Sequence, residues 1–534
     1  MKLMKNLVNY ITESKKNSLI DNIFIIIFFI FPILFLSPAA LNLSLILISF
    51  YFIYYTLKKK FFVWADSEIV KVLFIFWAYL FINSFLNYNS FTEVQKTFSY
   101  IRYIIFFISF IFLLPQLNVK FKNLFFVYLI IALLFCIDIL IQFTFEKNII
   151  GFECQMFCQR NSSFFRDELI AGSFILHIGI ISLSYFYFRK DKKLLIPLLI
   201  LFLISIFFTG DRTPFIMMII LLFCIGILKK ELRSKFFGLL IFVSIIFGTS
   251  LLLSEKLYKR YIINTLNIFQ TSEISLDSLN WWLEHTEKQE AFLKKISSKG
   301  YTSNMQEAGI TEDDIRYDSI KYNDLKIDNI IRSNEETFFL KDKNFYEIIL
   351  KRSNIILITE MVTKEIGPLK IKKHYLENVM LHRKKNNTQA KWYNNLFDSQ
   401  YGAHYLTAYS IFLDNLIIGT GIKSFRIKCK DHDNINSTSV NARCSTHPHN
   451  LHLEILSEFG LIGYFLFILI ILSFLKTFYL NTRNSEIIYV ILFSLVICIV
   501  FPLRPSGSFF STISSMLFWL SFSIFFLINE LQKK

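Results

Sequence analysis

Long apolar runs dominate this sequence and limit what it can fold into. Of its 534 residues, 54% are hydrophobic, and the mean hydropathy is +0.47. Runs of about 20 apolar residues are long enough to cross the hydrocarbon core of a bilayer as helices. The pattern predicts an all-α integral membrane protein with about twelve transmembrane helices. The predicted spans are residues 22–37, 41–57, 69–86, 98–114, 123–143, 169–188, 194–208, 213–228, 236–253, 457–476, 486–501 and 508–528.

The basic residues indicate on which side of the membrane each connection lies. Clusters of Lys and Arg occupy every second connection, among them residues 58–60, 189–193 and 229–235, and the connections between them contain few. Because cytoplasmic connections of membrane proteins are enriched in Lys and Arg, we predict that both ends of the chain are cytoplasmic. This topology explains the net charge of +16, so the charge does not indicate a nucleic-acid partner.

The N-terminal segment allows two interpretations. Lysines precede an apolar run at residues 23–36, and the run ends in Ser37-Pro38-Ala39-Ala40. This order resembles a cleavable signal peptide. Because further spans follow, an uncleaved first transmembrane helix is the favoured interpretation.

One outer connection, residues 254–450, is far too long for a turn. Gly and Pro are sparse in it, and residues 277–299 have a charged, helical pattern. We therefore predict one large periplasmic, mostly helical domain between the ninth and tenth spans. The chain then divides into residues 1–253 with the first nine helices, 254–450 as the outer region, and 451–534 with the last three.

Four of the seven cysteines fall in predicted outer connections, namely Cys154, Cys158, Cys429 and Cys444. An even number of cysteines outside the membrane suggests disulfides in an oxidising compartment, most simply Cys154–Cys158 and Cys429–Cys444. The alternative is a zinc site with four thiolates. The spacing within the two pairs is untypical of zinc ligands, so we favour the disulfides and predict no metal.

A segment with three histidines joins the outer region to the tenth span. Pro448 fits the first turn of a helix, where a missing N–H costs nothing. At 100° per residue, such a helix has one face that carries His449, His452, Leu453, Leu456, Gly460 and Gly463. Ionisable groups at membrane depth are costly and usually functional. The alternative is that a histidine at a helix start is an ordinary cap or surface group.

The order His449-Asn450, nine residues, then Gly460-Leu461-Ile462-Gly463 resembles the signature of the bacterial O-antigen ligase and O-antigen polymerase superfamily. The resemblance implies a glycosyltransferase that uses a polyprenyl-diphosphate-linked glycan at the periplasmic face of the inner membrane. It implies that His449 orients or deprotonates the acceptor hydroxyl. Neither ATP nor a cofactor is required, because the lipid pyrophosphate is already an activated leaving group.

Two arginines in outer connections fit the same resemblance. Arg166 precedes the sixth span, and Arg212 lies in a tight turn between the seventh and eighth spans. An arginine at a helix end commonly extends its guanidinium to the lipid headgroups. Positive charges are depleted on this side, however, and a guanidinium binds phosphate through paired hydrogen bonds. Comparable arginines of the superfamily are thought to hold the pyrophosphate, which implies catalytic roles for both.

Further candidates lie around the histidine segment. We expect residues in and near the superfamily pattern to contact the substrate, namely His447, Asn450, His404, Arg426, Arg443 and Glu458. A solvated basic loop is the alternative for Arg426 and Arg443. Gly419-Thr420-Gly421 lacks the strand, helix and third glycine of a phosphate loop, so we interpret it as a tight turn. Asp431-His432-Asp433 has the spacing of a nucleotide-sugar metal site, but such a triplet alone in a loop usually binds nothing.

The resemblance implies an inverting, metal-independent transfer and leaves the acceptor open. A ligase passes the glycan to lipid A–core, whereas a polymerase passes it to another lipid-linked repeat. A flippase for the same lipid is a third interpretation. Transporters often contain paired halves with interrupted helices, and no such symmetry is visible here. No Walker A, GxSxG, HExxH or Rossmann motif is present, which disfavours an ATP-driven pump, a serine hydrolase and a zinc protease.

Overall fold

The computed structural model describes residues 18–265, the strands between residues 316 and 362, and residues 400–431 and 444–533, apart from short gaps at 89, 156–157, 167, 190–191, 264, 482–485 and 503. The chain divides into two units. The first consists of Met1–Asn264, Ala408–Cys429 and Thr446–Lys534. The second consists of Thr265–Thr407 and Lys430–Ser445.

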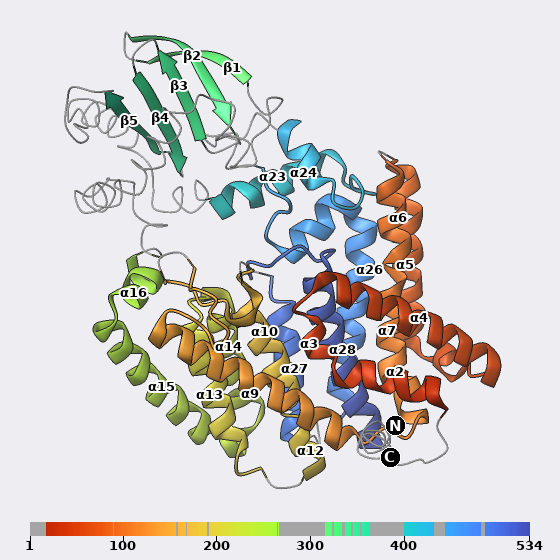
Figure 1. Ribbon diagram of the computed structural model, residues 1–534. Helices are drawn as coiled ribbons and strands as arrows, with labels where there is room; N and C mark the ends of the chain where they lie inside the picture. Colours follow the sequence, from red (N-terminus) through yellow and green to blue (C-terminus); the bar gives the residue numbers. More distant parts are fainter. Residues whose placement is uncertain are drawn as a thin grey trace. The chain divides into compact units, whose positions relative to one another are not determined.

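The first unit is a bundle of apolar helices (Figure 1). In the described part of the chain, eight helical segments are long and apolar enough to cross a membrane: Pro38–Lys59 (α4), Glu68–Leu86 (α5), Phe91–Gln116 (α6 to α8), Phe121–Phe145 (α9), Ala171–Arg189 (α10 to α12), Lys230–Leu253 (which includes α15, Arg233–Leu253), Leu451–Asn481 (α26) and Thr512–Gln532 (within α28, Thr512–Lys533). Shorter apolar helices are Leu19–Phe29 (α2), Leu195–Phe208 (α13), Arg212–Leu228 (α14) and Ile487–Ile499 (α27). Every predicted span overlaps one of these segments. Their number, length and apolar character are those of a multi-pass membrane protein. The number of crossings stays a prediction.

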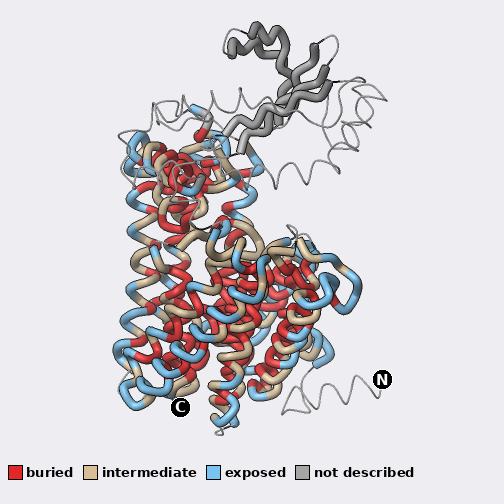
Figure 2. Tube along the Cα trace, turned by 90° about the vertical axis from the view of Figure 1, so that its left-hand side faces the viewer, coloured by how far each residue is buried: buried red, intermediate tan, exposed pale blue. Residues whose placement is uncertain are grey.

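The helices differ in how deeply they lie within the bundle (Figure 2). α28 packs against α7 (Ile101–Ile108) and α27, and most of its side chains are buried. α15 packs against α14, and most of its side chains are exposed. The exposed side chains include large apolar ones, such as Phe50 at 68% and Ile241 at 65% exposure. An apolar surface of this extent is unusual on a soluble protein but suits contact with lipid tails.

The second unit contains a five-stranded antiparallel sheet in the strand order β1-β2-β3-β4-β5 (Figure 1). Its strands are Arg316–Tyr322, Leu325–Ser333, Thr337–Asp342, Phe345–Arg352 and Ile355–Val362. Adjacent strands pair with their sequence neighbours, for example Phe338 with Ile349. The prediction of a mostly helical outer region is therefore wrong for these residues. Their sequences are rich in Ile and aromatic residues, which favour strands over helices.

Disulfides occur in both outer connections that were expected to contain them. Cys154 and Cys158 form a disulfide between α9 and α10. Cys429 and Cys444 are also disulfide-bonded. The cysteines Cys136, Cys224 and Cys498, which lie within helices, are free thiols. Disulfides persist in oxidising compartments, so this distribution fits an outward orientation of the two connections.

Candidate active site

The histidine segment precedes α26 and does not form its first turn. α26 begins at Leu451, and His449 has a φ of +56°, outside the helical region. The Oδ1 atom of Asn450 accepts hydrogen bonds from the backbone N–H groups of His452 and Leu453, each at 3.0 Å. Asn450 therefore caps the helix, as asparagine commonly does. The predicted helical face carrying His449 is wrong, because the cap residue ends the helix before it reaches this histidine.

The two histidines before the cap, His447 and His449, lie side by side and contact the connection between α27 and α28. Their rings are 4.1 Å apart between centroids. The Nε2 atom of His447 is 3.2 Å from the Ser506 carbonyl oxygen, and the Ser506 N–H donates to the His449 carbonyl oxygen at 2.8 Å. A carbonyl oxygen only accepts, so Nε2 of His447 carries the proton. Burial lowers the pKa of His449, and a hydrogen bond to the Ser506 backbone partly opposes this effect.

α26 is sharply kinked at Gly460, where φ is +62° and ψ is −164°. The kink lets the backbone of α26 pair with the segment that contains the Gly-Thr-Gly turn. The Leu461 N–H donates to the Leu416 carbonyl oxygen at 2.8 Å, and the Gly421 N–H donates to the Glu458 carbonyl oxygen at 2.8 Å. A Cβ atom on Gly419 would lie 2.4 Å from the backbone nitrogen of Phe459. The turn is thus a partner of the broken helix, as expected of a tight turn.

Two polar side chains of α26, those of Glu458 and His452, have structural partners. Glu458 accepts a hydrogen bond from the Lys423 backbone N–H at 2.7 Å, so it anchors the turn segment. His452 places Nε2 at 2.8 Å from the Val500 carbonyl oxygen and Nδ1 at 3.1 Å from the Tyr464 hydroxyl. Both ring nitrogens of His452 are therefore used within the bundle.

The remaining predicted contacts are dispersed. The Arg426 guanidinium is exposed and donates to the Thr446 carbonyl oxygen at 3.4 Å, directly before His447. His404 is buried on α23 (Gln400–Asp414), which belongs partly to the second unit. Arg443 and the metal candidates His432 and Asp433 lie outside the described residues. The structure thus gathers His447, His449, Asn450 and Arg426 around one short segment.

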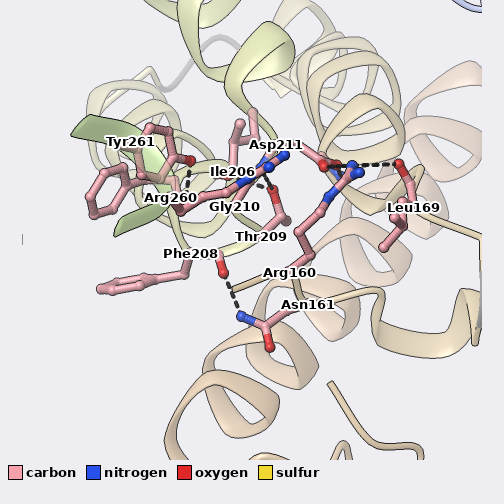
Figure 3. A network of polar contacts seen from close by, with 12 residues as sticks. Arg160, Asn161, Leu169, Ile206, Phe208, Thr209, Gly210, Asp211, Arg260 and Tyr261 are labelled. Carbon is pink, nitrogen blue, oxygen red and sulfur yellow. Dashed lines mark hydrogen bonds and ion pairs between the residues drawn. The ribbon is translucent and has the colours of Figure 1, made fainter. Parts of the chain in front are cut away.

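A second polar cluster lies around the turn between α13 and α14 and includes Arg260, beyond the end of α15 (Figure 3). Arg160 forms an ion pair with Asp211 and also donates to the Leu169 carbonyl oxygen at 3.2 Å. The other carboxylate oxygen of Asp211 accepts from the Gly172 N–H at 3.1 Å. Arg260 donates from Nε to the Gly210 carbonyl oxygen at 2.8 Å. Residues from three separate connections therefore converge on the turn that precedes α14.

The cluster brings several arginines close to one buried carboxylate. Burial, then the nearby charges of Arg160 and Arg212, lower the pKa of Arg260 to about 10, so Arg260 stays charged at neutral pH. Burial raises the pKa of Asp211, and the Arg160 guanidinium opposes this shift. Arg160, Arg212 and Arg260 thus lie close enough to interact electrostatically, with the Asp211 carboxylate among them. A positively charged, partly desolvated cluster of this kind is suited to a phosphate-bearing ligand.

The two predicted arginines have different positions. Arg212 is the first residue of α14 and belongs to this cluster. Arg166 is exposed, and its guanidinium lies 4.6 Å from the centre of the Phe152 ring. The sequence interpretation did not name Arg160 or Arg260 as site residues. Arg260 carried the same signal as Arg166 and Arg212, because it is a positive charge on the side where such charges are depleted.

Polar groups within α9 fix the connection that carries Arg160 and Arg166. The buried Asp138 carboxylate accepts from the Ser163 hydroxyl at 2.5 Å and from the Ile149 N–H at 2.9 Å. Gln142 accepts from the Ser163 N–H at 2.7 Å through Oε1. Buried polar groups in a membrane helix are costly unless they are bonded in this way. Asp138 and Gln142 therefore order the outer connection.

The kinked helix start is also the part of the chain that matches a known family. A family model described as O-Antigen ligase matches residues 375–468. This segment is therefore similar to the O-antigen ligase family. It contains the Gly-Thr-Gly turn, the histidine segment, the Asn450 cap and both glycines of α26. No curated protein and no solved structure matches the chain.

This match confirms the resemblance seen in the sequence. It supports a glycosyltransferase-type membrane enzyme of lipopolysaccharide assembly that acts on lipid-linked glycans. The match ends at residue 468 and begins at residue 375, so the arginine cluster lies in a part of the chain outside it. The cluster and the histidine segment from Thr446 onward belong to the same unit of the structure.

Proposed function

We propose that this protein transfers a glycan from a polyprenyl-diphosphate carrier to an acceptor hydroxyl of lipid A–core at the periplasmic face of the inner membrane. The observation that carries the proposal is the match to the O-antigen ligase family, in a segment where a half-buried histidine precedes a capped and kinked helix. The acceptor oxygen attacks the anomeric carbon of the glycan, and the bond from that carbon to the pyrophosphate oxygen breaks. One displacement of this kind inverts the anomeric configuration.

The arginine cluster is suited to hold the departing lipid pyrophosphate. Negative charge develops on the leaving oxygen as the glycosidic bond breaks, and preorganised donors at that place lower the barrier. Arg160 is held by Asp211, and Arg260 is held by the Gly210 carbonyl oxygen, so both are fixed before a ligand arrives. Arg212 contributes the third charge. We assign pyrophosphate binding to these three arginines, with Arg166 at the exposed margin.

His449 is suited to accept the proton of the acceptor hydroxyl. Burial lowers the pKa of its imidazole, so the ring is neutral and basic at neutral pH. The proton moves from the hydroxyl to His449 as the new carbon–oxygen bond forms. Arg426 bonds the carbonyl oxygen of Thr446, next to His447, and its guanidinium supplies donors for the acceptor's other hydroxyl or acidic groups.

The second candidate is a polymerase that joins lipid-linked repeat units. The described residues of the two clusters serve either acceptor, because both reactions break the same bond. Deletion of the gene tests the assignment. A ligase deletion leaves unmodified lipid A–core and accumulates long lipid-linked polymer, whereas a polymerase deletion leaves core with a single repeat. Lipid-linked glycan retained on the cytoplasmic side indicates a flippase and contradicts both.

A further inference from the structure

The segment Pro502–Phe509, between α27 and α28, runs alongside the histidine segment and contacts it repeatedly. The Asn450 side chain donates to the Pro502 carbonyl oxygen at 2.7 Å, and Asn450 forms an antiparallel bridge with Pro505. Ser506 contacts both His447 and His449. Its N–H donates to the His449 carbonyl oxygen, and its carbonyl oxygen accepts from Nε2 of His447. The position of His449 therefore depends on the position of Ser506.

Glu454 on α26 fixes the other end of this segment. Its side chain is buried, with 1% exposure. Oε1 accepts from the Ser508 hydroxyl at 2.6 Å, and Oε2 accepts from the Phe509 N–H at 2.7 Å. Hydrogen bonds to a carboxylate are short and strong, which offsets the cost of burying the group. Both carboxylate oxygens are thus committed to one short stretch of backbone.

The contacts form a closed ring of connections. The Glu454 N–H donates to the Asn450 carbonyl oxygen at 2.9 Å, so one helical turn separates Glu454 from the cap. From Glu454 the ring passes through Ser508 to Ser506, then to His449 and back to Asn450. A ring of this kind fixes the backbone of His449, whose positive φ is otherwise unfavourable for a residue with a side chain.

We propose that Glu454 is a positioning residue for His449, acting through the segment Pro502–Phe509. The inference rests on the proposed function, because it assigns His449 the role of base. Loss of the anchor displaces Ser506 and with it the imidazole. A displacement of about 1 Å from the reacting geometry costs on the order of 10²-fold in rate. The loss falls on kcat, while the KM for the lipid-linked donor stays unchanged, because the donor binds at the arginine cluster.

A double-mutant cycle with the purified full-length protein tests this. The donor is the lipid-linked glycan that accumulates in a strain lacking the gene, and the acceptor is that strain's unmodified lipid A–core. Glu454→Ala is expected to lower kcat on the order of 10²-fold in the native background. It is expected to cost little more in the His449→Ala background, because coupled residues are not additive. Glu454→Gln is expected to restore most activity, since the amide oxygen accepts from Phe509 and the Ser508 hydroxyl can rotate.

Ser457→Ala is the matched control. Ser457 is buried one turn further along α26, and its hydroxyl donates to the Leu453 and Glu454 carbonyl oxygens of its own helix. Its kcat should equal that of the native protein. If the Glu454→Ala protein does not insert into the membrane, Ser508→Ala takes its place in the cycle. This variant removes the hydroxyl that donates to Glu454. A native kcat in Glu454→Ala and Ser508→Ala would overturn the inference. So would a double variant with His449→Ala whose loss is the product of the two single losses. Absence of transfer by the native protein would instead refute the proposed function.

Discussion

His449 and His452 are three residues apart, but their surroundings give them different roles. His452 follows the Asn450 cap, lies inside the bundle with 8% exposure, and bonds Val500 and Tyr464 through its two ring nitrogens. His449 precedes the cap, is half-buried, and has a left-handed backbone. A base must be able to reach substrate, so only His449 fits that role. Proximity in sequence to a family signature is thus insufficient to assign function to each histidine.

Replacement of His449 is expected to remove transfer without removing the protein. Loss of a general base costs on the order of 10²–10⁴-fold in rate, so His449→Ala should show a loss of this size at matched expression. His452→Ala serves as the comparison, because it leaves the Val500 carbonyl oxygen without its donor. We expect it to lower thermal stability and to affect kcat less. Transfer at nearly the native rate by His449→Ala would assign the proton to another group.

The activity should also depend on pH through His449. Burial lowers the pKa of this imidazole below its ordinary value of 6.5, and the base acts only when neutral. The rate should therefore be constant near neutral pH and fall as the pH drops through the lowered pKa, giving an acidic limb below pH 6.5. The residual rate of His449→Ala should lack this limb, and His447→Ala should keep it. A limb centred above pH 7 would contradict a neutral, buried base.

Arg260 provides a test of the pyrophosphate site with a matched control. Arg260→Ala removes one of the three charges near Asp211 and should cost about 10²–10³-fold in rate. Arg260→Lys should restore activity only partly, because an ammonium does not reproduce the planar fork. Arg233 also donates to a glycine carbonyl oxygen, that of Gly226, but at the opposite end of α15. Arg233→Ala should leave transfer unchanged, and equal losses in both variants would indicate a general folding defect.

At the scale of elements, the kink of α26 joins two segments that are far apart in sequence. The backbone from Glu458 to Ile462 bonds the stretch from Leu416 to Gly421, and α5 supplies further donors. Tyr79 donates to the Phe459 carbonyl oxygen at 2.8 Å, and Asn83 donates to the Ile418 carbonyl oxygen at 2.6 Å. These bonds satisfy backbone groups that a break in a helix otherwise leaves unpaired at membrane depth. The break therefore holds the histidine-bearing end of α26 in a defined direction.

Gly460 should not tolerate a side chain. Its φ and ψ lie in a region that only glycine adopts readily, which costs another residue roughly 1–3 kcal/mol. A Cβ atom there would also lie 2.4 Å from the Ile417 carbonyl oxygen. Gly460→Ala should therefore lower thermal stability and transfer together. Gly248→Ala, on exposed α15 with open space around the Cβ, should change neither. Normal melting of Gly460→Ala in detergent would argue against the kink.

The sequence predicted the helices well but not their local departures. A helix that crosses a membrane needs a long apolar run, and such runs are visible in the sequence. Every predicted span therefore overlaps an observed segment. Periodicity extended α26 back to Pro448, because it ignores the side chain of Asn450 as a cap. The sheet was missed although an Asn lies between each pair of its short strands, a common turn signal. Arg160 and Asp211 are fifty-one residues apart, and only folding shows that they pair.

At the scale of the whole molecule, both clusters are built from helix ends that lie on the same side of the membrane in the predicted topology. The arginine cluster uses the end of α13, the start of α14 and the residues after α15, and the histidine site uses the start of α26 and the connection from α27 to α28. Alternate helices reverse direction across a membrane, so these ends share one side if every predicted span crosses. The Lys-rich connections fall at the opposite ends, among them residues 58–60 and 229–235. In the predicted topology, both clusters therefore lie on the side opposite the Lys-rich connections.

This segregation predicts that residues 429–450 face the periplasm and residues 229–235 face the cytoplasm. The physical reason is that Lys and Arg near short connections are retained on the cytoplasmic side during insertion. Alkaline phosphatase and green fluorescent protein fused at each place should report opposite sides, since the first is active only outside and the second only inside. A fusion after residue 60 is the control and should match the one at 229–235. Both test sites on the same side of the membrane would separate the histidine segment from the arginine cluster, and no single active site would then contain both.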